Sequence, residues 1–81
     1  MKFNVWVTIG LKKGIIDPEG INTKKALELL GFSKISDVKT LKIFEITVDA
    51  PDKEAARSEI DKMCMKLLAN PVINDYTVAF K

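Results

Sequence analysis

The sequence predicts a small α+β domain with the element order strand, helix, strand, strand, helix, strand. Three observations lead to this prediction. Apolar and polar residues alternate near both ends of the chain, two capped helical segments lie between these ends, and two further alternating segments separate the helices. The 81 residues leave room for one domain, residues 1–81, and no linker-like segment divides it.

The first strand and the first helix are predicted within residues 3–31. Every second residue at the start is apolar, which is typical of a strand with one buried face: Phe3, Val5, Val7, Ile9 and Leu11. Asp17 can cap a helix, Pro18 suits the first helical position, and Glu19 lies favourably at the positive end of the helix dipole. Gly31 is expected to end this helix, whose apolar stripe is Ala26, Leu27 and Leu30.

Two strands joined by a hairpin are predicted between the helices. Residues 35–39 and 42–48 both have a strand-like pattern, and the second has alternating apolar positions at Phe44, Ile46 and Val48. The hairpin falls at Thr40 and Leu41. Neither residue is Gly, Asn or Asp, which the tight two-residue turns favour, so the sequence leaves the register of this hairpin open.

The second helix and the last strand complete the domain. Asp49 or Asp52 is expected to cap a helix whose apolar residues recur at spacings of three and four, namely Ala56, Ile60, Met63, Cys64, Leu67 and Leu68. Asn70 can take the left-handed conformation that closes a helix, and Pro71 cannot continue one. The last strand places Tyr76, Val78 and Phe80 on one face. This order is the split βαβ arrangement of ferredoxin-like domains, with four antiparallel strands and two helices on one face.

The sheet face away from the helices is predicted to be an interaction surface. If the helices cover the side formed by Val5, Val7 and Ile9, then Trp6, Thr8 and Ile43 point outward. A contiguous apolar patch is unusual on a monomer, and unpaired strand edges also invite association. In the alternative interpretation, Trp6 is an ordinary half-covered surface aromatic.

Catalytic chemistry is hard to place in this chain. There is no histidine and only one cysteine, so the usual nucleophilic triads and zinc sites have too few ligands or bases. Cys64 falls on the apolar stripe of the second helix, where a thiol behaves as a small inert hydrophobe. Capping explains the acidic residues at the helix starts. We therefore expect no catalytic, cofactor-binding or metal-binding residues.

Phosphate, nucleic acid and membranes have little support as ligands. Lys12, Lys13 and Gly14 precede the first helix, but Asp17 and Glu19 put negative charge where a phosphate would lie. The net charge of +2 comes from scattered residues, and the strand at residues 42–48 lacks the aromatics on which RNA-recognition domains stack bases. No signal peptide or membrane-length apolar segment is visible, which predicts a cytoplasmic location. A small-molecule-binding regulatory module with the same topology stays open, because Gly14 lies in the loop where such modules bind their ligand.

Several short motifs occur in a characteristic order. They are the first strand running into Leu11 and Lys12; Ile16, Asp17, Pro18, Glu19 and Gly20; Ala26 and Leu27 followed by Leu30, Gly31 and Phe32; Asp37, Val38 and Lys39; and Cys64 to Tyr76 with Leu67, Leu68, Ala69, Asn70, Pro71, Val72 and Ile73. Over nearly its whole length, the chain thereby resembles the PurS family, the small subunits of phosphoribosylformylglycinamidine synthase. One departure is the hairpin, where PurS-like chains usually carry a glycine and a lysine and this chain has Thr40, Leu41 and Lys42.

The resemblance implies a non-catalytic subunit of an ATP-dependent amide ligase in de novo purine biosynthesis. In such an enzyme a glutaminase subunit releases ammonia from glutamine, and a large synthetase subunit uses ATP and magnesium to activate formylglycinamide ribonucleotide. The PurS-like chain would bridge the two. The implied partners are these two subunits and further copies of the chain itself, as a homodimer or a dimer of dimers.

Two turns join the outer sheet face as candidate contact regions. One lies at the start of the first helix and the other follows the second helix. The predicted interface residues are Trp6, Thr8, Ile43, Asp17, Pro18, Gly20, Asn70, Pro71, Val72 and Ile73. Both turns could equally serve only to cap their helices.

Overall fold

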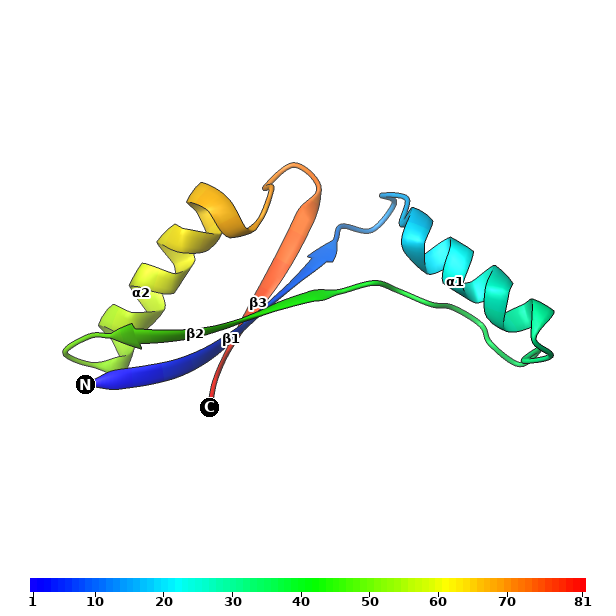
Figure 1. The fold of residues 1–81 in the computed structure, drawn as a ribbon. Helices are drawn as coiled ribbons and strands as arrows, with labels where there is room; N and C mark the ends of the chain where they lie inside the picture. The colour runs from blue at the N-terminus through cyan, green and yellow to red at the C-terminus, as the bar shows by residue number, and fades with distance from the viewer.

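The computed structural model describes residues 1–81 and contains three strands, two α-helices and one π-helical turn. In chain order these are β1 (Lys2–Leu11), α1 (Pro18–Leu29), β2 (Lys42–Asp49), α2 (Lys53–Met63), the π-helical turn η1 (Cys64–Leu68) and β3 (Asn74–Phe80). The strands form one antiparallel sheet in the order β2-β1-β3, with β1 in the centre (Figure 1). None of the helices combines the length and the apolarity that crossing a bilayer requires.

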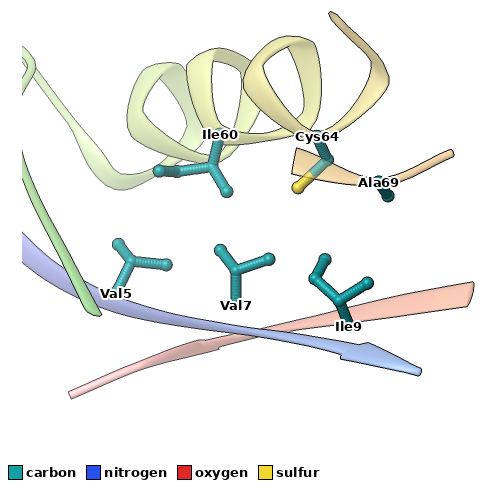
Figure 2. Packing of buried hydrophobic residues seen from close by; sticks show 6 residues of the cluster. All are labelled: Val5, Val7, Ile9, Ile60, Cys64 and Ala69. Carbon is teal, nitrogen blue, oxygen red and sulfur yellow. The ribbon is translucent and has the colours of Figure 1, made fainter. Parts of the chain in front are cut away.

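The core lies between α2 and one face of the sheet. Val5, Val7 and Ile9 of β1 point toward Ile60 and Cys64, as Figure 2 shows. The register sets Val7 opposite Phe44 on β2 and Val78 on β3, so the inward residues of all three strands form one layer. The predicted inward faces of the first and last strands are confirmed.

The second helix begins where one of its two predicted caps lies. Asp52 is the cap, because its Oδ1 accepts a hydrogen bond of 2.8 Å from the backbone N–H of Ala55. At the other end, the N–H of Ala69 donates to the carbonyl oxygen of Cys64 at 2.9 Å, a π-helical bond that spans five residues. The wider turn rotates the chain, so Leu67 is 84% exposed and Ala69 is buried instead. The prediction that Leu67 belongs to the buried stripe is therefore wrong.

The first helix does not cover the sheet, so the prediction of two helices on one face is also wrong. Figure 1 shows α1 standing well away from the three strands. Leu29 and Leu30 are 89% and 74% exposed, and Gly20 is the one buried residue of α1. We call residues 12–41, which comprise α1 and the segments on either side of it, the arm.

The end of α1 is closed as the sequence predicts. Gly31 has a φ of +101°, and its N–H donates to the carbonyl oxygen of Glu28 at 3.0 Å. The N–H of Phe32 donates to the carbonyl oxygen of Leu27 at 3.1 Å, which completes a Schellman motif. Glycine tolerates this left-handed conformation because it has no Cβ.

The predicted strand at residues 35–39 and the hairpin at Thr40 and Leu41 are not formed, so the sheet has three strands instead of four. The chain instead turns back after α1, and residues 35–41 then run as one extended segment into β2 (Figure 1). The residues at the predicted turn explain this difference, since neither of them favours the tight turn that a hairpin needs. Extended residues without a neighbouring strand do not form a ladder.

The arm makes the molecule long and thin. The radius of gyration is 16.2 Å, and the extents along the principal axes are 51 × 25 × 15 Å. A compact chain of this length has a radius of gyration of about 12 Å. Only 9 of the 81 residues are buried, and all of the fully buried large side chains belong to β1, α2 and η1.

Candidate functional site

The outer sheet face contains the first three predicted interface residues. Trp6 lies in the central strand and is 36% exposed, while Ile43 in β2 is 53% exposed and pairs with Thr8 in the register. The Nζ atom of Lys81 lies 3.8 Å from the centroid of the Trp6 ring, a cation–π contact. The three residues are therefore neighbours on one surface, on the side of the sheet opposite α2, as predicted.

The turn before α1 is held by more hydrogen bonds than a helix cap alone provides. Asp17 caps the helix through Oδ1, which accepts the N–H of Gly20 at 3.0 Å. Its Oδ2 accepts the N–H of Thr40 at 2.7 Å, from the segment that returns from α1. These hydrogen bonds hold the pKa of the Asp17 carboxyl below its usual range, the bond from Gly20 contributing most. Pro18 occupies the first turn of the helix and is exposed, whereas Gly20 is buried.

The turn after η1 has a different geometry from the one predicted. No residue other than glycine has a positive φ, so Asn70 does not take the left-handed conformation. The reason is Pro71, which restricts the residue before it to extended conformations. Asn70 instead organises the turn through its side chain, because its Oδ1 accepts the N–H of Val72 at 2.9 Å. Val72 is 77% exposed and Ile73 is 36% exposed.

The two turns lie close to the same end of β1. The N–H of Lys12 donates to the carbonyl oxygen of Ile73 at 2.8 Å, which ties the second turn to the start of the arm. One groove is lined both by Asp17 and Pro18 at the arm and by Leu68 and Asn74 beside η1. Of the predicted turn residues, only Asp17 and Pro18 line this groove. The predicted residues therefore lie on the outer sheet face and at two turns near the place where the arm joins the domain.

Cys64 and Tyr76 are held in unreactive settings. Burial raises the pKa of the Cys64 thiol, and the nearby Asp61 carboxylate raises it further. The hydroxyl of Tyr76 donates to Oδ1 of Asp61 at 3.2 Å, and burial is the main reason why its pKa is raised. A thiol and a phenol that stay protonated are weak nucleophiles.

The exposed apolar side chains of the arm were missed by the sequence reasoning. They are Ile15, Ile16, Ile21, Leu29, Leu30, Phe32 and Leu41. A signal was present in the sequence, since Ile21 and Leu29 fall outside the stripe formed by Ala26, Leu27 and Leu30. Apolar residues on several sides of a helix indicate that other parts of a protein or assembly pack against it on more than one side.

The chain is similar to known proteins along its whole length. Residues 4–81 match the family model PurS, phosphoribosylformylglycinamidine (FGAM) synthase. The phosphoribosylformylglycinamidine synthase subunit PurS of Archaeoglobus fulgidus is 51% identical over 75 residues, which cover 93% of this chain and 94% of that protein.

Solved structures have the same fold. The crystal structure of Methanocaldococcus jannaschii PurS, one of the subunits of formylglycinamide ribonucleotide amidotransferase, matches with a TM-score of 0.88 and 40% identity over 98% of this chain and 95% of that chain. A chain in the structure of PurLQS from Thermotoga maritima matches with a TM-score of 0.93 and 25% identity over 100% of this chain and 99% of that chain. Both matches include the arm. The chain therefore belongs to the PurS family of phosphoribosylformylglycinamidine synthase.

Proposed function

We propose that this chain is the non-catalytic small subunit of phosphoribosylformylglycinamidine synthase and that it bridges the glutaminase and the ATP-dependent synthetase. The observation that carries the proposal is the match to the PurS family over residues 4–81, together with the likeness to a chain of the Thermotoga maritima PurLQS structure. In this role the chain helps ammonia from glutamine to reach formylglycinamide ribonucleotide. ATP, magnesium and glutamine are used by the partner subunits, and this chain binds no cofactor.

The surface of the chain supports self-association as part of this role. The accessible area is 6254 Å². A compact monomer of the same mass exposes about 4,900 Å², so the excess is about 1,350 Å². A standard protein interface buries about 800 Å² on each partner. The arm provides apolar side chains for such an interface, and a second copy of the chain, as a dimer or a dimer of dimers, is the occupant that we propose for it.

The outer sheet face is the surface that we assign to the partner subunits. Trp6 and Ile43 lie on the side of the sheet opposite α2, whereas the apolar side chains of the arm lie beyond the end of β1 and the start of β2, so self-association through the arm leaves this face free. A partly exposed tryptophan in the central strand is typical of the residues that contribute strongly to protein interfaces. The oligomer then holds the glutaminase and the synthetase in register.

Reconstitution tests the bridging role. The glutaminase and synthetase of the same organism are assayed with and without this chain, once with glutamine and once with excess ammonium. We expect glutamine-dependent turnover to require the chain and ammonium-dependent turnover to depend on it much less, because free ammonium needs no transfer between subunits. Glutamine-dependent turnover that is unchanged when the chain is omitted contradicts the proposal.

Variants of the outer face sharpen the same assay. Ile43→Glu places a charge on the outer face in an edge strand, and Ser58→Glu places the same charge on an exposed position of α2. Circular dichroism checks that both variants keep the fold. The proposal expects Ile43→Glu to weaken glutamine-dependent turnover and Ser58→Glu to leave it unchanged. If the two variants have equal glutamine-dependent turnover, the outer face is not part of the bridging surface.

A further inference from the structure

The two segments that connect α1 to the sheet meet at Asp17. This residue lies on the outgoing segment, and Thr40 lies 23 positions later on the returning one. One carboxylate joins them, because Oδ1 accepts the N–H of Gly20 at 3.0 Å and Oδ2 accepts the N–H of Thr40 at 2.7 Å. A helix cap uses only one carboxylate oxygen. The second oxygen therefore makes a contact that capping does not explain.

The backbones also approach each other very closely at this point. A Cβ atom added to Gly20 would collide with the carbonyl oxygen of Val38 and would lie 2.6 Å from Oδ2 of Asp17. The first oxygen belongs to the returning segment and the second to the outgoing one, so only glycine fits between them. Gly20 is buried in a part of the molecule where nearly every other residue is exposed.

We propose that Asp17 is a positioning residue that fixes the direction in which α1 leaves the sheet. Together with Gly20, Val38 and Thr40 it forms what we call the Asp17 clamp. No strand ladder continues beyond Leu11 and Lys42, and α1 itself has no packed face against the core. The clamp therefore holds the hydrogen bond that ties the two segments to one another at the base of the helix.

The ionisation of Asp17 is consistent with this role. Its pKa is lowered by the hydrogen bonds from Gly20 and Thr40, so the carboxylate is the form that the clamp holds. A second groove, which Asp17 also lines, contains charged groups of both signs that set the field around the carboxylate: Lys12, Lys13, Asp37 and Lys39. Glu19 on α1 lines the adjoining groove.

A distance measurement tests the proposal in the intact chain. Lys25→Cys on α1 and Ser58→Cys on α2, both exposed positions, carry nitroxide labels in a Cys64→Ala background, and the distance distribution is recorded by pulsed electron spin resonance. Dilution with unlabelled chain isolates the distance within one molecule when the chain self-associates. We expect one narrow distribution for this parent. A broad parent distribution overturns the proposal.

Two variants remove the clamp in different ways. Asp17→Ser keeps a short capping oxygen but cannot reach both segments, and Thr40→Pro removes the N–H that Oδ2 accepts while it leaves Asp17 in place. We expect both to broaden or shift the distribution, with the far-ultraviolet circular dichroism of the sheet and α2 retained. If either variant fails to fold, the other decides the question.

Two matched controls separate the clamp from general effects. Thr40→Ser keeps both the backbone N–H and the hydroxyl that lie against Asp17, and Ser36→Pro places a proline in the same extended segment at an N–H that makes no hydrogen bond. Both should leave the distribution unchanged. Unchanged distances in Asp17→Ser and Thr40→Pro, or equal broadening in the controls, overturn the proposal. The experiment uses neither partner subunit, so its outcome is independent of the bridging role.

Discussion

Single carboxylates set much of the local structure in this chain. Asp52 and Asp17 both cap helices, but only Asp17 also accepts a hydrogen bond from a distant segment. The sequence predicted Asp17 as a cap, and for the second helix it offered Asp49 or Asp52, from their positions before a helix. It could not predict the bond to Thr40, because nothing in the local pattern says which segment returns beside the cap.

The Asp17 clamp should weaken in acid. The pKa of Asp17 is lower in the folded chain than the ordinary value of about 3.9, so its stabilising effect is fully present above that value and is lost as the pH falls through the folded pKa. We expect the N–H groups of Gly20 and Thr40 to lose protection from hydrogen exchange below about pH 4. The measurement is exchange by nuclear magnetic resonance, with each rate divided by the intrinsic rate at that pH.

Two comparisons decide what such a loss means. The N–H of Val7 in the central strand should keep its protection over the same range. Asp17→Ser should show low protection at Thr40 at every pH, whereas protection of the Gly20 N–H, which a serine oxygen can still cap, should no longer depend on pH in this range. If Val7 loses protection in parallel, the change reports global unfolding and not the clamp. Protection that persists at Thr40 through the whole acid range contradicts the assignment.

The elements of this fold differ in how much of their structure is locally determined. β1, β3 and the start of α2 follow from alternation and capping, and the structure agrees with the sequence at each of them. Residues 35–39 have the same strand-like pattern but lie in an extended segment without a ladder, because a strand needs a neighbour that local pattern cannot supply. The π-helical turn was missed for a related reason, since the spacing of three and four assumes an unbroken α-helix.

The π-helical turn makes neighbouring leucines unequal. Leu68 packs against the core cluster, whereas Leu67 is 84% exposed. We expect Leu68→Ala to lower the free energy of unfolding by about 2 kcal/mol, and Leu67→Ala to change it by no more than about 0.5 kcal/mol. Denaturant unfolding at a fixed chain concentration measures both. A larger loss in Leu67→Ala than in Leu68→Ala would mean that the helix continues in α form past Cys64.

The molecule as a whole has more apolar surface than its own core can bury. The arm accounts for the long shape, and its apolar side chains lie where the sheet and α2 cannot cover them. The candidate outer face was predictable from strand alternation, because it depends only on which residues point away from the core. The apolar arm was not, because the prediction placed α1 on the sheet.

Self-association should depend on the tip of α1. In the double variant Leu29→Glu with Leu30→Glu, two charges replace two leucines that are 89% and 74% exposed in the single chain. We expect the dissociation constant of the oligomer to rise at least about tenfold, which corresponds to 1.4 kcal/mol. Light scattering over a concentration series measures it, and Lys25→Glu on the same helix is the control. Equal association of the double variant and the parent would exclude this surface.

The connection between β1 and β2 has one more implication. Ile9 lies opposite Lys42 in the register, so the thirty residues between Leu11 and Lys42 leave the sheet and rejoin it at adjacent positions. In this respect they behave as an insertion in what would otherwise be a short β-hairpin. Lengthening, shortening or grafting this segment would leave Val5, Val7 and Ile60 packed as they are. Such changes would alter how far the protein extends toward other chains. They would not alter the stability of the unit that the sheet and α2 form.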